Sequence, residues 1–340
     1  MKLEQALTFD DVLIRPGYSS ILPRDVNTKT KFSRDISINI PLVSAAMDTV
    51  TEAKLAIAIA QGGGIGVLHK NNTISQQVDE IVKVKKYESG MVVDPITISA
   101  DSNLKELFRL KKKYNISGFP VVDKKNKVVG IITNRDVRFA KNMSQPIRDL
   151  MTKSNLITAE EGIKQKKALE MLHNNKIEKL IVIDKSKKCV GLITVTDIEK
   201  SHKFPLATKD NIGRLRVAAA IGVGYDGLER AKSIYNAGAD AIVLDTAHGH
   251  SKRVIDTIKD LKKIVKNNIQ VIAGNIATKE AAKMLAKQKV DGIKIGIGPG
   301  SICTTRIIAG VGVPQFSAIT EVYEAIKNFK IPLIADGGIR

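Results

Sequence analysis

Residues 270–305 read QVIAGNIATKEAAKMLAKQKVDGIKIGIGPGSICTT, and this stretch decides the fold. Two short apolar runs, Gln270 to Ala273 and Gly292 to Ile295, have the length and continuity of buried parallel strands. Thr278 to Gln288, between them, has a helical pattern. Each run ends in a polar or glycine-rich cluster: Gly274-Asn275 after the first and the loop from Gly296 after the second. The stretch therefore predicts a strand, a helix and a second, parallel strand, with polar groups just past the strand ends.

The same alternation of apolar runs and helical patterns extends on both sides of this stretch. The further runs are Ile40 to Met47, Gly64 to His69, Val217 to Val223, Ala241 to Leu244 and Pro332 to Ala335. Polar clusters past the carboxyl ends of successive parallel strands are typical of a (β/α)8 TIM barrel. We therefore expect an α/β protein with this barrel, seven of whose strands lie in the chain while the eighth is missing. A doubly wound parallel sheet is the alternative fold, and it explains the polar strand ends less well.

An internal repeat interrupts the barrel between its second and third units. Val129 to Asp136 matches Val190 to Asp197, and the same offset carries Phe119 to Asp123 onto Leu180 to Asp184. Each copy has the pattern strand, helix, strand, strand, helix, so two copies form a paired module. We expect the barrel to comprise residues 1–88 and 210–340, and the two copies to comprise residues 91–148 and 149–203.

The composition is that of a globular protein with more than one domain. The 340 residues exceed what one ordinary core takes, and 43% are hydrophobic and 26% charged. The net charge of +19 comes from scattered lysines, and aromatic residues make up only 4%, so we do not expect direct nucleic-acid binding. Two cysteines, with no secretory signal and no membrane-spanning run, predict a cytoplasmic protein without a membrane segment.

The loop from Gly296 to Thr305 predicts a covalent cysteine enzyme with an anionic substrate. Its glycines free the backbone to approach a ligand. Cys303 follows in a segment where neighbouring backbone N–H groups would favour the reactive thiolate. A small buried filler is the alternative reading of Cys303, and a helix start is an equally natural role for Thr304 or Thr305.

Four segments resemble the family of inosine 5′-monophosphate (IMP) dehydrogenases and guanosine monophosphate (GMP) reductases. They are Thr8–Pro16, Ser44–Val50, Gly296–Arg306 and Ala335–Ile339. The repeat resembles the paired CBS (Bateman) insertion of the dehydrogenases. The resemblance covers essentially the whole chain. It implies NAD-dependent oxidation of IMP to xanthosine 5′-monophosphate, the committed step of guanine nucleotide synthesis.

The resemblance implies catalytic and phosphate-binding roles for residues of two glycine-rich loops. Cys303 would attack C2 of the hypoxanthine ring, and Thr305 would help orient substrate or water. Ser301 would contact the substrate phosphate, and Gly337 and Gly338 would let a second loop approach it.

The substrate nucleoside would have its own contacts. Asp336 would accept hydrogen bonds from the substrate ribose, and formation of the turn before two glycines is the alternative role for this residue. Asn275 and Met47 would flank the reacting rings.

The implied cofactors are NAD and K⁺. Asp245 would bind the nicotinamide ribose, and Gly296, Ile297 and Gly298 would line the cofactor side. The backbone carbonyls of Gly298, Gly300 and Cys303 would hold K⁺, since hard cations take oxygen ligands.

The resemblance also implies regulation and assembly. The paired repeat would bind adenine nucleotides, with Asp136 and Asp197 as ribose contacts, and a purely structural dimerising module is the alternative. The family is tetrameric, so we expect a homotetramer of the complete chain.

The family continues beyond the point where this sequence stops. An eighth strand, a mobile flap and an arginine–tyrosine pair serving as base would follow Arg340, so we expect the 340-residue chain alone to be inactive. Two other functions stay open. One is GMP reductase, which the CBS insertion disfavours; the other is a non-catalytic nucleotide sensor, which the intact Cys303 loop disfavours.

Overall fold

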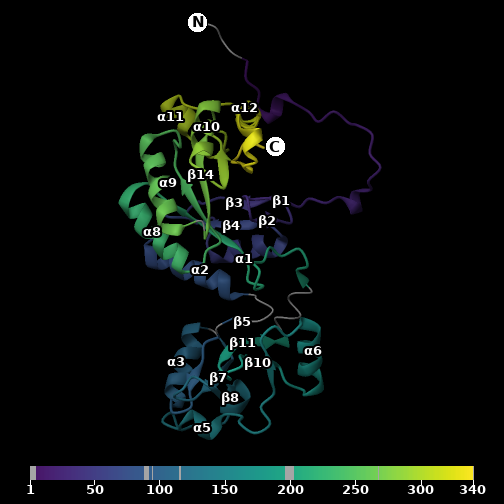
Figure 1. The fold of residues 1–340 in the computed structure, drawn as a ribbon, viewed down its shortest axis with the longest axis vertical. Coiled ribbons are helices and arrows are strands. Elements are labelled where there is room, and N and C mark those ends of the chain that lie inside the picture. Colours follow the sequence, from purple (N-terminus) through teal and green to yellow (C-terminus); the bar gives the residue numbers. More distant parts are fainter. Residues whose placement is uncertain are drawn as a thin grey trace. The chain divides into compact units, whose positions relative to one another are not determined.

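The computed structural model describes residues 5–87, 92–93, 95–114, 116–195, 203–266 and 268–339 (Figure 1). The chain divides into two compact units. The first contains residues 1–87, 206–210 and 215–340, and the second contains residues 88–205 and 211–214. The first unit is therefore assembled from segments on both sides of an insertion.

A seven-stranded sheet forms the centre of the first unit, and all its strands are parallel. Neighbours follow one another in chain order: β3 (Val43–Ser44), β4 (Ile65–Leu68), β12 (Val217–Ile221), β13 (Ala241–Asp245), β14 (Gln270–Ile276), β15 (Gly292–Ile295) and β16 (Leu333–Ala335). Each lies in or overlaps one of the predicted runs. A doubly wound sheet would reverse its strand order partway, so the barrel architecture is confirmed and the alternative is wrong. Within the described residues, no eighth strand pairs with β3 or β16.

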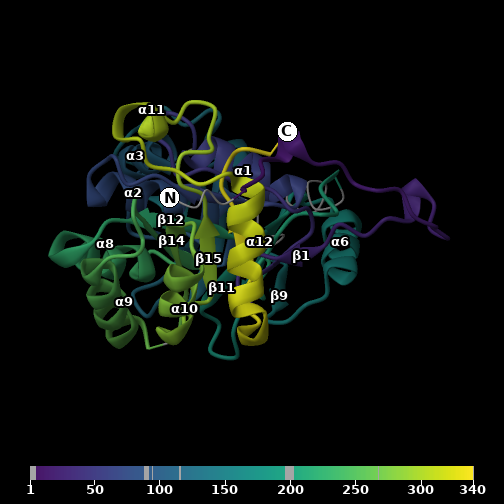
Figure 2. The same ribbon diagram turned by 90° about the horizontal axis from the view of Figure 1, so that it is seen from above.

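Helices connect these strands, and Figure 2 shows α8, α9, α10 and α12 following one another along one side of the sheet. Their bounds are α1 (Ala53–Gly62), α2 (Ile74–Tyr87), α8 (Gly224–Asn236), α9 (Lys252–Val265), α10 (Lys279–Lys287), α11 (Thr305–Ala309) and α12 (Gln315–Ile326), with 3₁₀ turns at Phe9–Asp11, Pro23–Asp25 and Lys327–Phe329. Ser251 and Thr278 begin α9 and α10 because their hydroxyl oxygens accept backbone N–H groups. No helix within the described ranges is long and apolar enough to cross a membrane.

The sheet is apolar on both faces. In β12, Val217, Ala219 and Ile221 pack into the core that the helices share, whereas Ala218 and Ala220 belong to a second, interior core. The interior core also contains Phe32, Ile36 and Ile38, from the segment that carries the antiparallel strands β1 (Thr30–Lys31) and β2 (Ser37–Ile38). Burial on both faces explains why the strands read as continuous apolar runs rather than as alternating ones.

The second unit contains the predicted repeat. Its elements are β5 (Val92–Val93), β6 (Ile98–Ser99), α3 (Leu104–Tyr114), β7 (Gly118–Val122), β8 (Val128–Thr133), α4 (Asn134–Val137), α5 (Ile147–Leu150), β9 (Thr158–Glu160), α6 (Gln165–Asn174), β10 (Lys179–Ile183) and β11 (Cys189–Thr194). The sequence offset carries the strand register of one copy onto the other. Phe119 pairs with Ile132 in the first copy, and Leu180 pairs with Ile193 in the second. This register is what the predicted repeat requires.

Candidate active site

Charged and amide side chains gather at the carboxyl ends of the barrel strands. Lys294, in β15, lies 3.3 Å from Asp245 Oδ1 at the end of β13. Its Nζ is also 2.8 Å from Oδ2 of Asp336, which follows β16. Two aspartates predicted to bind two different riboses are thus held by one lysine.

Lys294 was not among the predicted site residues, although its sequence carries a signal. It is the one charged residue in the apolar run Gly292 to Ile295, and such a residue in a buried strand needs a partner. Burial alone would lower the pKa of Lys294, but the charges of Asp245 and Asp336 outweigh burial and raise the pKa. The ammonium therefore stays charged and fixes the two carboxylates.

Asn275, in β14, joins Asp336 to the glycine loop. Its Nδ2 donates to Asp336 Oδ2 at 2.7 Å and to the carbonyl oxygen of Gly296 at 2.9 Å. Its Oδ1 is buried and has no hydrogen-bond partner in the described part of the chain. A buried acceptor without a donor is costly, so this oxygen is available to a ligand that can donate to it.

The two glycine loops are in contact. A Cβ added to Gly337 would lie 3.0 Å from Gly300 Cα, and one added to Gly338 would lie 2.8 Å from Pro299 Cβ. Both residues also have φ near +75° (75° and 73°), which favours glycine. The second loop therefore approaches the first only because neither position carries a side chain.

Gln315, which was not among the predicted site residues, supports the contact between the two loops through hydrogen bonds. Its side chain is buried, and its Nε2 donates to the carbonyl oxygens of Ile295 at 3.0 Å and Asp336 at 3.4 Å. The N–H of Asp336 donates to the same Ile295 oxygen at 2.8 Å. One amide thus joins the ends of β15 and β16. Only the tertiary structure reveals this role.

Cys303 lies beside Thr305 in the loop. The two side chains approach to 3.3 Å between Sγ and Oγ1, and the Cys303 N–H donates to the carbonyl oxygen of Gly300. Hydrogen bonds from the hydroxyl and backbone of Thr305 lower the pKa of the Cys303 thiol. Cys303 is half-buried, so it is not a buried filler. Thr305 also begins α11, so the predicted helix start holds as well.

A cavity of about 860 Å³ lies between the two edge strands of the sheet. Of the predicted site residues, it is lined by Met47, Gly300, Ser301, Asp336, Gly337 and Gly338. Its volume falls in the range of small-molecule sites. The structure thus brings the predicted phosphate and ribose contacts to the wall of one cavity.

Other predicted residues lie outside that lining. Cys303, Thr305, Asn275, Asp245, Gly296 and Gly298 are not among the lining residues. The side chain of Ile297 packs against the core shared with the helices. For K⁺, the described residues hold no group of three acidic, histidine or cysteine side chains that could ligate a metal. A cation in this loop would therefore depend on carbonyl oxygens, such as the one Gly300 already offers to Cys303.

The predicted nucleotide contacts of the second unit are only partly described. Asp136 Oδ2 accepts the N–H and hydroxyl of Thr133 at 2.6 and 2.7 Å, and its Oδ1 accepts the hydroxyl of Thr152 at 3.1 Å. The carboxylate thus caps α4 in this structure. Asp197 lies outside the described residues.

Comparisons with known proteins identify the family. A family profile described as "IMP dehydrogenase / GMP reductase domain" matches residues 6–340. Inosine-5′-monophosphate dehydrogenase of Aquifex aeolicus is 53% identical over 341 residues, covering 100% of this chain and 69% of that protein. The enzyme of the same name from Helicobacter pylori is 53% identical over 338 residues, covering 99% and 69%.

Solved structures are similar as well. GMP reductase from Trypanosoma brucei in complex with guanosine 5′-monophosphate has a TM-score of 0.90 and 36% identity, covering 99% of this chain and 72% of that one. The same reductase in complex with guanosine 5′-triphosphate has a TM-score of 0.90 and covers 99% and 82%. With the profile, the relatives and the shared fold in agreement, the chain belongs to the IMP dehydrogenase/GMP reductase family of oxidoreductases.

Proposed function

We propose that the protein oxidises inosine 5′-monophosphate to xanthosine 5′-monophosphate with NAD⁺, through a covalent intermediate on Cys303. The observation that carries this proposal is a thiol whose pKa is lowered by Thr305, in a glycine loop packed against the Asp336 loop. The relatives named IMP dehydrogenase, at 53% identity, support IMP as the substrate.

The binding roles follow from the chemistry of the cavity wall. Ser301 and the loop of Gly337 and Gly338 would bind the substrate phosphate, because backbone N–H groups and a hydroxyl suit an anion. Asp336 would accept the ribose hydroxyls, because a carboxylate only accepts. The Oδ1 atom of Asn275 would accept a hydrogen bond from bound substrate, and Met47 would pack against the base.

The chemistry would then run in two steps. The Cys303 thiolate attacks C2 of the purine, a C–S bond forms, and the C2 hydrogen leaves with its electron pair. NAD⁺, when bound beside Asp245 and the Gly296–Gly298 segment, supplies the acceptor for that hydride. Water then adds to C2 of the thioimidate, the C–S bond breaks, and the thiol is regenerated. Thr305 would orient the water or the substrate.

K⁺ is part of the proposal through the donors of one loop. The backbone carbonyls of Gly298, Gly300 and Cys303 would supply the oxygen ligands that a hard cation takes. Such a cation would fix the loop that carries the nucleophile.

The decisive experiment counts the NADH that the purified 340-residue chain forms with saturating IMP and NAD⁺. We expect a burst of up to one NADH per Cys303. Alkylation of Cys303 by iodoacetamide, followed by mass spectrometry, should be slowed by IMP. A chain that forms no NADH and whose Cys303 is not protected by IMP would contradict the proposal.

GMP reductase is the second candidate, because the solved structures with a TM-score of 0.90 bear that name. Those reductases cover 99% of this chain, and so match the inserted unit too. The insertion therefore disfavours GMP reductase less strongly than the sequence indicated. NADPH oxidation with GMP, measured against NAD⁺ reduction with IMP, decides between the two functions.

For the second unit we propose a CBS pair, residues 91–148 and 149–203, inserted in a barrel of residues 1–88 and 210–340. Adenine nucleotides would bind it near Asp136 and Asp197, and the repeat register supports the pairing. We further propose a homotetramer for the complete protein. Titration of ATP into the protein, followed by calorimetry, tests the nucleotide site. Light scattering tests the assembly.

A further inference from the structure

Lys70, which follows β4, contacts the carboxylate that we assign to the NAD⁺ ribose. Its Nζ lies 3.3 Å from Asp245 Oδ2 and donates to the Asp245 carbonyl oxygen at 3.0 Å. We propose that Lys70 is a positioning residue that orients the Asp245 carboxylate toward the ribose hydroxyls of NAD⁺. This inference rests on the proposed function, and it adds a determinant of cofactor affinity.

Asp245 is held by two different lysines, one on each oxygen. Lys294 contacts Oδ1 and Lys70 contacts Oδ2, both at 3.3 Å. A carboxylate held through both oxygens cannot rotate without losing an ion pair. It has about four acceptor positions in total, so lone pairs are left for two ribose hydroxyls. Without Lys70, the carboxylate would be free to turn about its contact with Lys294.

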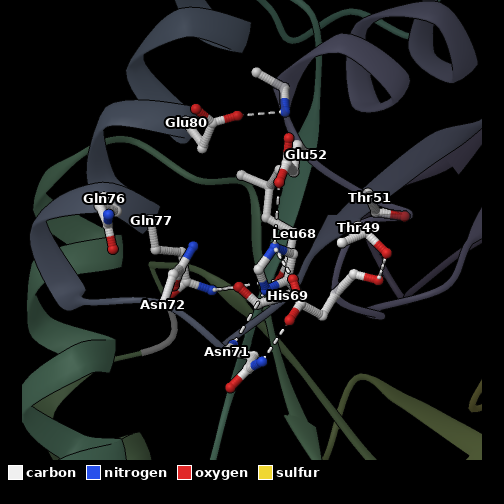
Figure 3. A network of polar contacts seen from close by, with 12 residues as sticks. Thr49, Thr51, Glu52, Leu68, His69, Asn71, Asn72, Gln76, Gln77 and Glu80 are labelled. Atoms are coloured by element: carbon white, nitrogen blue, oxygen red, sulfur yellow. Dashed lines mark hydrogen bonds and ion pairs between the residues drawn. The ribbon is translucent and has the colours of Figure 1, made fainter.

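The backbone on both sides of Lys70 is fixed by a polar network (Figure 3). His69 is buried, and its Nδ1 accepts the N–H of Asn71 at 3.1 Å. The Asn71 Nδ2 donates to Asp48 Oδ2 at 2.5 Å, and the buried Gln77 donates to the His69 carbonyl oxygen at 2.9 Å. Lys70 therefore extends from an anchored segment, which is what a positioning role requires.

The same network reaches the loop that carries Met47. The His69 Nε2 lies 3.7 Å from Asp48 Oδ1 and 3.9 Å from Glu52 Oε1. Between those two acidic residues, Thr49 has φ +60°, a strained value for a β-branched residue that persists only where the surroundings impose it. The segment from His69 to Asn71 thus supports the substrate side and the cofactor side together.

Direct contact between Lys70 and the cofactor is the alternative to be tested. Lys70 also lines a second cavity of about 790 Å³, together with Asp48, Tyr225 and Arg230. An ammonium on that wall could bind a phosphate itself. Its two bonds to Asp245 favour the positioning role.

The test is the dissociation constant for NAD⁺, measured by calorimetry without IMP. We expect Lys70→Met to weaken NAD⁺ binding about fivefold to tenfold, since a charge-assisted contact is lost at a partly exposed site. IMP binding and the alkylation rate of Cys303 should change by less than about twofold, and Lys70→Arg should restore NAD⁺ affinity. Lys232→Met, which removes an exposed lysine–glutamate pair on α8, is the matched control and should have no effect.

A double-mutant cycle with Asp245→Asn separates positioning from direct contact. If Lys70 acts through Asp245, adding Lys70→Met to Asp245→Asn costs less than about twofold. If the two effects multiply, Lys70 contacts the cofactor itself and the inference is overturned. Unchanged NAD⁺ affinity in Lys70→Met overturns it too. A wild-type chain that binds NAD⁺ but gives no NADH burst contradicts only the proposed function, whereas one that binds no NAD⁺ contradicts both.

Discussion

A lysine bridges two aspartates at each end of the barrel sheet, and the two clusters differ in exposure. At the amino ends of the strands, Lys85 contacts Asp240 at 2.9 Å and Asp210 at 3.0 Å, and the three side chains are 5%, 8% and 11% exposed. Asp240 also accepts the N–H of Val217 and pairs with Arg216. In this buried cluster, the protein's own N–H, ammonium and guanidinium groups bind the carboxylate oxygens.

The cluster at the carboxyl ends is more open. Lys294 is 15% exposed, but its partners Asp245 and Asp336 are 23% and 32% exposed. Asp336 also lines the larger cavity. A lysine bridging two aspartates therefore stabilises the fold where all three side chains are buried. Where one of the aspartates lines a cavity, its carboxylate oxygens can also accept hydrogen bonds from a ligand. Substitutions at the two ends should separate stability from function.

The largest effect is expected from Cys303→Ala at the carboxyl end. Without the thiolate no covalent adduct forms, so the NADH burst should fall by a factor on the order of 10³ or more, with the thermal unfolding midpoint unchanged. The control is Cys189→Ala in the second unit, which should retain the full burst. A burst that survives in Cys303→Ala would disprove covalent catalysis at this residue.

Lys85→Met, at the amino end, should do the reverse. Removing one partner of a buried ion pair leaves Asp240 and Asp210 without their shared cation, which costs about 3 kcal/mol. Urea denaturation should show this loss, while the NADH burst at low temperature stays within about twofold. Lys83→Met, two residues earlier on an exposed face, should cost little. Equal stability of the two variants would refute the structural role.

Asp336→Asn and Asp240→Asn are matched substitutions that remove one carboxylate at each end of the sheet. Loss of a charge-assisted hydrogen bond to the ribose should weaken IMP binding about tenfold to a hundredfold in Asp336→Asn. The loss of stability should be smaller than in Asp240→Asn, because Lys294 keeps its contact with Asp245. Asp240→Asn should leave IMP binding unchanged and lower the free energy of unfolding. Calorimetric titration and urea denaturation of both variants measure this crossover. Weakened IMP binding in both would mean that the two ends are coupled.

The smallest effect concerns the acidity of the nucleophile. Hydrogen bonds from Thr305 lower the pKa of Cys303, so the thiolate is populated at lower pH than in an ordinary thiol. In Thr305→Val the midpoint of the pH dependence of alkylation should rise, which slows the reaction at neutral pH but not at high pH. Thr304→Val is the control, because its side chain makes no capping hydrogen bond. A lowered or unchanged midpoint in Thr305→Val would exclude the hydroxyl as the cause.

Much of the site could be predicted because its signals are local. The glycines at 337 and 338 predicted a close approach of the backbone, and in the structure Gly337 lies against Gly300 and Gly338 against Pro299. Cys303 and Thr305 are two positions apart, so their contact depended on one loop alone. The repeat could be read from its offset because both copies keep the same strand register.

The charged partners of the site could not be predicted in this way. Lys83 and Lys85 stand two positions apart on α2, yet the side chain of one is 63% exposed and that of the other 5%. Lys70 reaches Asp245 across 175 positions, and Lys85 reaches Asp210 across 125. The sequence around a lysine does not show whether its side chain is solvated or forms an ion pair. The pairing depends on which strand ends lie next to each other in the folded sheet.

The sequence by itself determined the strand runs, the inserted repeat and the two glycine loops, because backbone period, burial and positive φ leave their pattern within a few residues. Only the tertiary structure decided that Lys294 joins Asp245 to Asp336 and that Lys70 holds the first of them. The reason is that closing a parallel sheet brings the ends of distant strands together. The energy of an ion pair depends on the distance between its two charges and on their burial, and the order of the residues gives neither.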